Sequence, residues 1–183
     1  MTPLVGRFWN ISFDQTVRFG PNRLSGFAQS CARGMMIRAE IILLTHHQYY
    51  SRYDYWYPQQ EKQLAEFFSR PVLWFWGHEH RMAIYEEFGV RGGVRAFGRC
   101  IGHGGMPVDL PPAKPKHARC VVEFTDRRHY PNDENLAIGF NRFAKLSLHD
   151  NRATIQYVDV HGAAIFLESW TCEAGKLQRD QKC

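Results

Sequence analysis

Residues 41–48 read IILLTHHQ and residues 72–80 read VLWFWGHEH, and the fold follows from these two stretches. Each contains a short apolar run without polar alternation, which is typical of a strand buried on both faces. The predicted strands cover residues 39–44 and 72–76. Each run ends just before a cluster of histidines, so the two clusters follow two predicted strands.

The residues between these strands predict a helix. Pro58 suits the first position of a helix, and the stretch 59–69 places Leu64, Phe67 and Phe68 at the i, i+3, i+4 spacing of an amphipathic helix. A strand, a helix and a strand in this order predict a βαβ unit with parallel strands and a right-handed crossover. Because ligand sites of such sheets lie at the carboxyl ends of the strands, both histidine clusters are expected near one point.

The rest of the chain favours antiparallel strands. We expect a hairpin with a Gly-Gly turn over residues 82–101, a strand over 119–125, a hairpin over 143–160 that turns at Asp150-Asn151, and a strand over 163–170. The predicted fold class is therefore α/β, a βαβ unit followed by antiparallel hairpins. The expected regions are an irregular segment 1–36, a domain over 37–172 and a polar tail over 173–183.

The composition is that of one folded domain. The chain has 183 residues, of which 44% are hydrophobic, enough for a packed core. Its net charge of +5 is compatible with an anionic ligand. The apolar runs are far shorter than the roughly 20 residues of a transmembrane helix, so no membrane span is expected. An odd number of cysteines without a C-x-x-C pair, and an N-terminus without a secretory pattern, favour a cytoplasmic protein.

Four of the nine histidines stand in the clusters His46-His47 and His78-Glu79-His80. Neutral imidazole binds zinc, iron and manganese, and several imidazoles must converge to hold an ion. The Gly-His-x-His turn contributes two imidazoles, and the backbone freedom of Gly77 shapes this turn. The neighbouring strand end contributes a third imidazole from another direction. Either cluster alone suits solvated loop histidines. Their shared sheet edge favours a metal site.

Together with RCIGHGG at residues 99–105, these stretches resemble the C-terminal half of calcineurin-like metallophosphoesterases. The resemblance covers roughly residues 38–170 and implies the C-terminal part of an α/β sandwich. It also implies a centre of two divalent metal ions, Zn, Fe or Mn, that polarises a phosphate ester and activates water for in-line attack. The implied function is therefore that of a metal-dependent phosphoesterase, a hydrolase with a phosphate-ester substrate.

The resemblance also implies roles for single residues. The implied metal ligands are His46, His78 and His80. His47 stands at the adjacent position and is implied as the catalytic group on the substrate side. Arg81 and His103 are implied as substrate-binding residues. A cross-strand ion pair for Arg81 and a turn position for His103 are the alternatives that the residues leave open.

The chain departs from the family in its carboxylates. The family motifs D-x-H, G-D-x-x-D and G-N-H-[DE] belong before these residues, yet no G-D or N-H dipeptide occurs. The single D-x-H, Asp159-Val160-His161, falls in the second predicted hairpin, and we interpret it as a strand feature. Three neutral imidazoles cannot offset the repulsion between two cations. We therefore expect a fragment, or a relative without catalysis, that binds one metal weakly and hydrolyses phosphate esters slowly or not at all.

Two alternatives belong to other functional classes. A nucleic-acid-binding module would use aromatic and basic residues such as Tyr53, Trp56 and Arg52, but the arginines are scattered, which makes this alternative the weaker one. A non-catalytic single-metal domain would act with a partner chain. The tyrosine-rich segment 49–57 suits a substrate lid or sheet packing equally. Without preceding strands, one buried strand would present an apolar edge, so we expect self-association.

Overall fold

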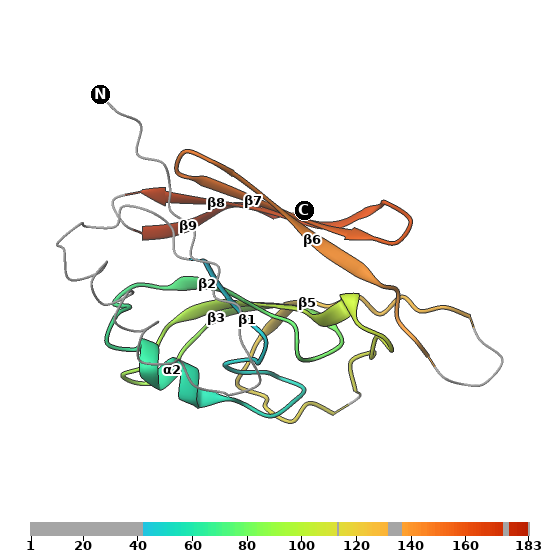
Figure 1. Cartoon of the computed structure of the whole chain (residues 1–183), viewed down its shortest axis with the longest axis horizontal. Coiled ribbons are helices and arrows are strands. Elements are labelled where there is room, and N and C mark those ends of the chain that lie inside the picture. Colours follow the sequence, from blue (N-terminus) through green and yellow to red (C-terminus); the bar gives the residue numbers. More distant parts are fainter. Residues whose placement is uncertain (1–41, 113, 132–136, 174–175, 183) are drawn as a thin grey trace.

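The computed structural model describes residues 42–112, 114–131, 137–173 and 176–182. Two β-sheets lie face to face, and helix α2 lies on the far side of the first sheet (Figure 1). The described chain is mixed but mostly β, with two sheets and few helices. None of the described helices is long and apolar enough to cross a membrane. The segment expected to be irregular, residues 1–36, lies outside the described residues.

The first sheet contains the predicted βαβ unit. Strands β1 (Ile42–Thr45) and β2 (Val72–Trp76) pair in parallel, and α2 (Pro58–Leu64) lies between them in the chain. Pro58 occupies the start of the helix, as predicted. The helix ends before the predicted residue 69 because the chain tightens into a turn, in which the Phe67 N–H donates to the Leu64 carbonyl (3.0 Å).

The two parallel strands differ in burial. All five residues of β2 are buried, as predicted, because β2 lies between β1 and β4 (Ala96–Ile101) and both of its faces are covered. The prediction of two buried faces is wrong for β1, where Leu43 is buried but Leu44 is 36% exposed. Strand β1 ends the described strand order, and the apolar contacts of the second sheet concentrate on β2 and β3.

The predicted hairpin and the strand after it are confirmed. Strand β3 (Met82–Phe88) pairs antiparallel with β4, and β5 (Val122–Phe124) pairs antiparallel with β3. Gly92, in the connection between β3 and β4, has φ +76°, a backbone conformation that favours glycine. Because β4 also pairs in parallel with β2, the sheet has the order β1-β2-β4-β3-β5.

The second sheet is antiparallel throughout. Its strands are β6 (Arg142–His149), β7 (Arg152–Asp159), β8 (Ala164–Glu173) and β9 (Lys176–Lys182). The predicted turn between β6 and β7 is confirmed, with Asp150 at φ 52°. The expected polar tail 173–183 is wrong in part, because β9 pairs with β8 from Glu173↔Lys176 onward. Its polar sequence suits an edge strand, in which Leu177 packs against the core between the sheets.

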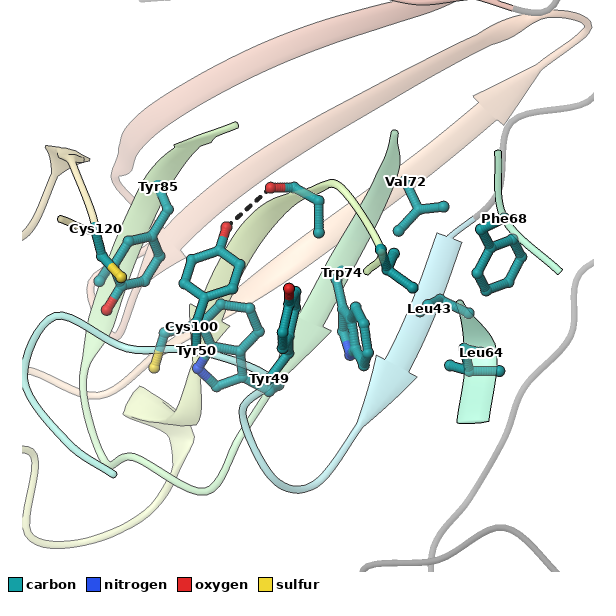
Figure 2. Packing of buried hydrophobic residues seen from close by; sticks show 14 of the residues in the cluster. Leu43, Tyr49, Tyr50, Leu64, Phe68, Val72, Trp74, Tyr85, Cys100 and Cys120 are labelled. Atoms are coloured by element: carbon teal, nitrogen blue, oxygen red, sulfur yellow. Dashed lines mark hydrogen bonds between the residues drawn. The ribbon is translucent and has the colours of Figure 1, made fainter. Parts of the chain in front are cut away.

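Aromatic side chains fill the layer between the first sheet and the segment 48–68 (Figure 2). Tyr49 and Tyr50 are almost fully buried there. The Tyr50 hydroxyl donates to the Ala96 carbonyl (3.0 Å, dashed in Figure 2) and accepts from the Gly98 N–H (2.8 Å). These two tyrosines therefore pack on the sheet, which is the second of the two roles expected for this segment.

An ion network crosses the apolar layer between the two sheets. Arg99 of β4 donates from Nε and Nη2 to the two carboxylate oxygens of Glu168 on β8, at 2.7 Å each, and both side chains are fully buried. Arg179 of β9 pairs with Glu168 (2.8 Å) and also with Glu123 of β5. Two cations thus face two carboxylates. Because an unpaired buried charge is costly, the network constrains how the sheets stack.

We predict that Glu168→Gln lowers the free energy of unfolding by about 3–5 kcal/mol, because it keeps the side-chain volume but leaves the Arg99 guanidinium buried without its counter-ion. Urea unfolding followed by circular dichroism measures the change. The control is Glu87→Gln, whose pair with Arg95 (3.3 Å) is exposed and should contribute less than about 1 kcal/mol. Equal losses in both variants would contradict the assignment.

Candidate metal centre

Three histidines meet at the carboxyl ends of β1 and β2. His46, His47 and His78 each offer a ring nitrogen, and these three atoms lie within 4.8 Å of one another. His46 Nε2 and His78 Nδ1 are 3.1 Å apart, so one of them donates to the other. The rings of His47 and His78 are also close, with centroids 4.5 Å apart. The predicted convergence of the two clusters is therefore present in the structure.

Main-chain contacts hold the two strand ends together. The N–H groups of Gly77 and His78 both donate to the His46 carbonyl, at 3.1 and 2.8 Å. Thr45 Oγ1 donates to the His47 carbonyl (2.8 Å) and itself accepts from the indole N–H of Trp74 (2.9 Å). The first histidine pair is thus anchored to β2 through both backbone and side-chain hydrogen bonds.

The local electrostatics favour the neutral form of His47 and His78. Burial lowers the pKa of His47, and the neighbouring His78 and His46 lower it further. Burial also lowers the pKa of His78, with a further contribution from His46, while the carboxylate of Asp54 opposes the change. A neutral ring keeps one nitrogen lone pair free for a cation.

The donor set fits one borderline cation. Three imidazole nitrogens match the preference of zinc and of divalent iron, and they leave a coordination position open. Within the part of the chain that the structure describes, no carboxylate joins this group. A second cation beside the first would lack the negative charge it needs, so the group suits a single ion.

His80 stands apart from this group. Its Nδ1 lies 3.2 Å from the carbonyl oxygen of Pro107, and because a carbonyl only accepts, Nδ1 carries the proton. The ring rests on Gly105, where an added Cβ would lie 3.0 Å from Nε2. Nε2 is therefore the nitrogen left for a ligand role, and backbone contact at the second nitrogen is typical of metal-binding histidines. The role expected for His80 stays a prediction.

The two expected substrate-binding residues are engaged elsewhere. The Arg81 guanidinium lies 3.6 Å from Glu79 and 3.8 Å from Asp109, and Nη1 donates to the Leu110 carbonyl (3.3 Å). His103 is 0% exposed, so direct contact with a substrate is not possible in this conformation. The surrounding chain encloses His103 in the short η1 helix (Gly102–Gly104), so its position is that of a turn residue, the alternative that the sequence left open.

The single D-x-H motif has a structural role. Asp159, the last residue of β7, accepts from the N–H groups of His161 and Ala163, both at 3.0 Å. Its other carboxylate oxygen pairs with Arg128 (3.0 Å). The interpretation as a strand feature agrees with these contacts, which cap the turn into β8.

Sequence reasoning missed the importance of Glu79. Its side chain is only 3% exposed, between two histidines that are partly exposed. Ser51 Oγ donates to Oε2 (2.8 Å) and the Trp76 indole N–H donates to Oε1 (3.3 Å). Burial raises the pKa of the Glu79 carboxyl to about 7, although Ser51 and Arg81 oppose the change. Alternation along the His-Glu-His turn indicates that Glu79 points away from its histidine neighbours, but residue types alone do not show that the carboxyl group is buried.

The turn of the second cluster depends on Gly102, a residue in the η1 helix (Gly102–Gly104), and not on Gly77 as expected. A Cβ at Gly77 would meet nothing within 4 Å, and its backbone lies outside the left-handed region. A Cβ at Gly102 would lie 1.9 Å from the Glu79 carbonyl oxygen and 2.3 Å from that of Gly77. The absence of a side chain at Gly102 therefore lets the end of β4 approach the histidine turn.

We predict that Gly102→Ala lowers the free energy of unfolding by about 1–3 kcal/mol, because backbone atoms must move to admit the methyl group. Gly77→Ala is the matched control and should change it by less than about 0.5 kcal/mol. Chemical unfolding of both variants tests the pair. If Gly102→Ala left the free energy of unfolding unchanged and Gly77→Ala lowered it, the turn would depend on Gly77 and not on Gly102.

The burial of His103 predicts a pH dependence of stability. Burial, together with a smaller contribution from Arg142, lowers its pKa from 6.5 to about 4. The unfolded chain protonates His103 at higher pH than the folded chain does. The contribution of neutral His103 to the free energy of unfolding is therefore complete above pH 6.5 and is lost as the pH falls toward 4. The loss over this window amounts to about 3 kcal/mol.

Unfolding free energies of wild type and His103→Gln between pH 8 and 4 measure this contribution. The variant should lose less stability over the window, because its amide does not titrate. His149→Gln, at a side chain that is 90% exposed, is the control and should follow the wild type. Parallel curves for all three proteins would show that His103 is not buried in its neutral form.

Neither a protein-family model nor a curated protein matches this chain. The functional assignment therefore depends on the residues themselves. Its centre is the group of three imidazoles that the parallel strands β1 and β2 bring to one sheet edge.

Proposed function

We propose that this chain binds one divalent metal ion through His46, His47 and His78, in a site of the calcineurin-like phosphoesterase type. The observation that supports this most directly is that one ring nitrogen from each of the three histidines lies within 4.8 Å of the other two. The nitrogens come from two loops that are distant in sequence but adjacent at the ends of β1 and β2. Such convergence is what a metal site requires and what unrelated loop histidines lack.

Zinc, iron or manganese would suit these ligands, with zinc and iron favoured by an all-imidazole set. When bound, the ion would act as a Lewis acid toward a phosphoryl oxygen. The protein would hold the ring nitrogens in place through the contacts of Thr45, Trp74 and the His46 carbonyl. In this assignment His47 contributes a ligand instead of the catalytic group expected from the resemblance.

The same geometry argues for weak or absent hydrolysis by the chain alone. No carboxylate among the described residues joins the three imidazoles. Arg81 is held by Glu79, Asp109 and the Leu110 carbonyl, and His103 is buried, so neither is free to bind a phosphate. A non-catalytic single-metal domain is therefore the second candidate, and it uses the same three ligands.

The nucleic-acid alternative loses its support. Tyr53 is 7% exposed, so it offers no open face for base stacking. The Trp56 indole N–H donates to the Ser51 carbonyl (2.7 Å), and Arg52 donates from Nη1 to the carbonyl of Cys120 (2.9 Å). These side chains join the tyrosine-rich segment to the body of the protein.

We predict that the purified chain, titrated with the metal, binds about one zinc or iron ion. His46→Ala and His78→Ala should each weaken binding at least tenfold, since loss of a ligand should exceed the roughly 10–100-fold effect of losing a supporting contact. Elemental analysis and isothermal titration calorimetry measure stoichiometry and affinity. His149→Ala, at an exposed position, is the control and should bind like the wild type.

A chain that binds no metal, or variants that bind as well as wild type, would refute the proposed site. Hydrolysis of a chromogenic phosphodiester by the loaded chain should be slow or undetectable. Turnover at about 1 s⁻¹ or faster, in the usual range of enzymes, would contradict the weak-activity part of the proposal while leaving the metal site intact.

A further inference from the structure

Glu79 is a buried carboxyl group in the middle of a turn whose two histidines are partly exposed. Burial of a carboxyl group is costly unless its oxygens are hydrogen-bonded. Both oxygens of Glu79 are: Oε2 accepts from Ser51 Oγ (2.8 Å) and Oε1 accepts from the Trp76 indole (3.3 Å). The Arg81 guanidinium lies 3.6 Å away. Glu79 is thus built into the protein interior.

Ser51 belongs to the loop that follows the first histidine pair. Its hydroxyl has one proton, which it donates to Glu79, and its oxygen accepts from the N–H groups of Tyr53 (2.9 Å) and Asp54 (3.0 Å). Two backbone N–H groups occupy the acceptor side, and the Tyr85 hydroxyl lies farther from Ser51 Oγ (3.4 Å) than Glu79 does, so the donor is directed at Glu79. This arrangement leaves little freedom for the Ser51–Glu79 hydrogen bond.

The two histidine-bearing loops are consequently tied together twice. The backbone tie joins the His46 carbonyl to the N–H groups of Gly77 and His78. The side-chain tie joins Ser51 to Glu79. Main-chain contacts complete the turn, because the Arg81 N–H donates to the Glu79 carbonyl at 2.7 Å. Glu79 is buried, whereas His78 and His80, before and after it in the turn, are partly exposed.

We propose that Glu79, through its hydrogen bond to Ser51, is a positioning residue that sets the place of His78 relative to His46 and His47. The part of this inference that concerns metal affinity rests on the proposed function. The geometric part, the contact between His46 Nε2 and His78 Nδ1 at 3.1 Å, exists without any ion. The two parts can therefore be measured separately.

The first measurement uses the metal-free chain at pH 8. Two-bond ¹H–¹⁵N spectra report the ring nitrogens of His46 and His78. Glu79→Ala and Ser51→Ala should both shift these signals and abolish the chemical-shift effect of the hydrogen bond between the two rings. Glu61→Ala is the matched control: Glu61 is also 3% exposed and accepts from the Val94 N–H (3.1 Å), but it lies on α2. It should lose stability without moving the histidine signals.

The second measurement is zinc affinity by calorimetry. Glu79→Ala and Ser51→Ala should each raise the dissociation constant about 10–100-fold, the range for residues that support a ligand. The double variant should be no worse than the poorer single variant, because both remove the same hydrogen bond. Should Glu79→Ala fail to fold, Glu79→Gln keeps the volume, replaces one acceptor oxygen by a donor, and should raise the constant less.

The outcomes separate the two proposals. Histidine signals and zinc affinity that stay at wild-type values in the Glu79 and Ser51 variants would overturn the positioning role. Shifted histidine signals in these variants, with a wild-type chain that binds no zinc, would refute the proposed function but uphold the positioning role. An equal effect of Glu61→Ala on the histidine signals would show that any loss of core stability moves them, and would also overturn it.

Discussion

A bidentate ion pair between Arg99 and Glu168 lies in the apolar layer where the two sheets meet, and the stacking of the sheets depends on it. The pair contributes more to the geometry of the fold than to its net stability, because the attraction between the two charges little more than offsets their desolvation cost. A shift of one sheet against the other would leave a buried charge unpaired. Arg99 sits on β4, and β4 borders β2, the strand that carries the second histidine cluster. The pair thus links the sheet that holds the histidines to the sheet that covers it.

The histidine edge shows the same pattern of polar groups inside an apolar framework. Apolar strands β1 and β2 bring the histidines to one edge, but hydrogen bonds decide their separation. The His46 carbonyl, Thr45 and Glu79 each hold one part of the two loops. These contacts fix the backbone of the two loops, which in the proposed metal site would lower the ordering cost of binding.

Much of the architecture could be predicted because it follows from local patterns. Uninterrupted apolar runs, the helix start at Pro58 and the glycine and Asp150 turns specified the βαβ unit and both hairpins. The errors have a common cause in long-range packing. The exposure of Leu44 depends on how far the second sheet extends, and the pairing of β9 depends on β8 offering an open edge. No window of sequence contains that information.

The sequence by itself determined that the clusters His46-His47 and His78-Glu79-His80 would lie at one sheet edge, because parallel strands end at the same edge whatever else surrounds them. It did not determine that His47, and not His80, joins His46 and His78. Only the tertiary structure decided what each neighbouring residue does. It enclosed His103, held Arg81 among protein acceptors, turned Glu79 inward toward Ser51 and required Gly102 to lack a side chain. These roles depend on atoms that are close in space but distant in the chain, and a pattern of residue types does not encode such distances.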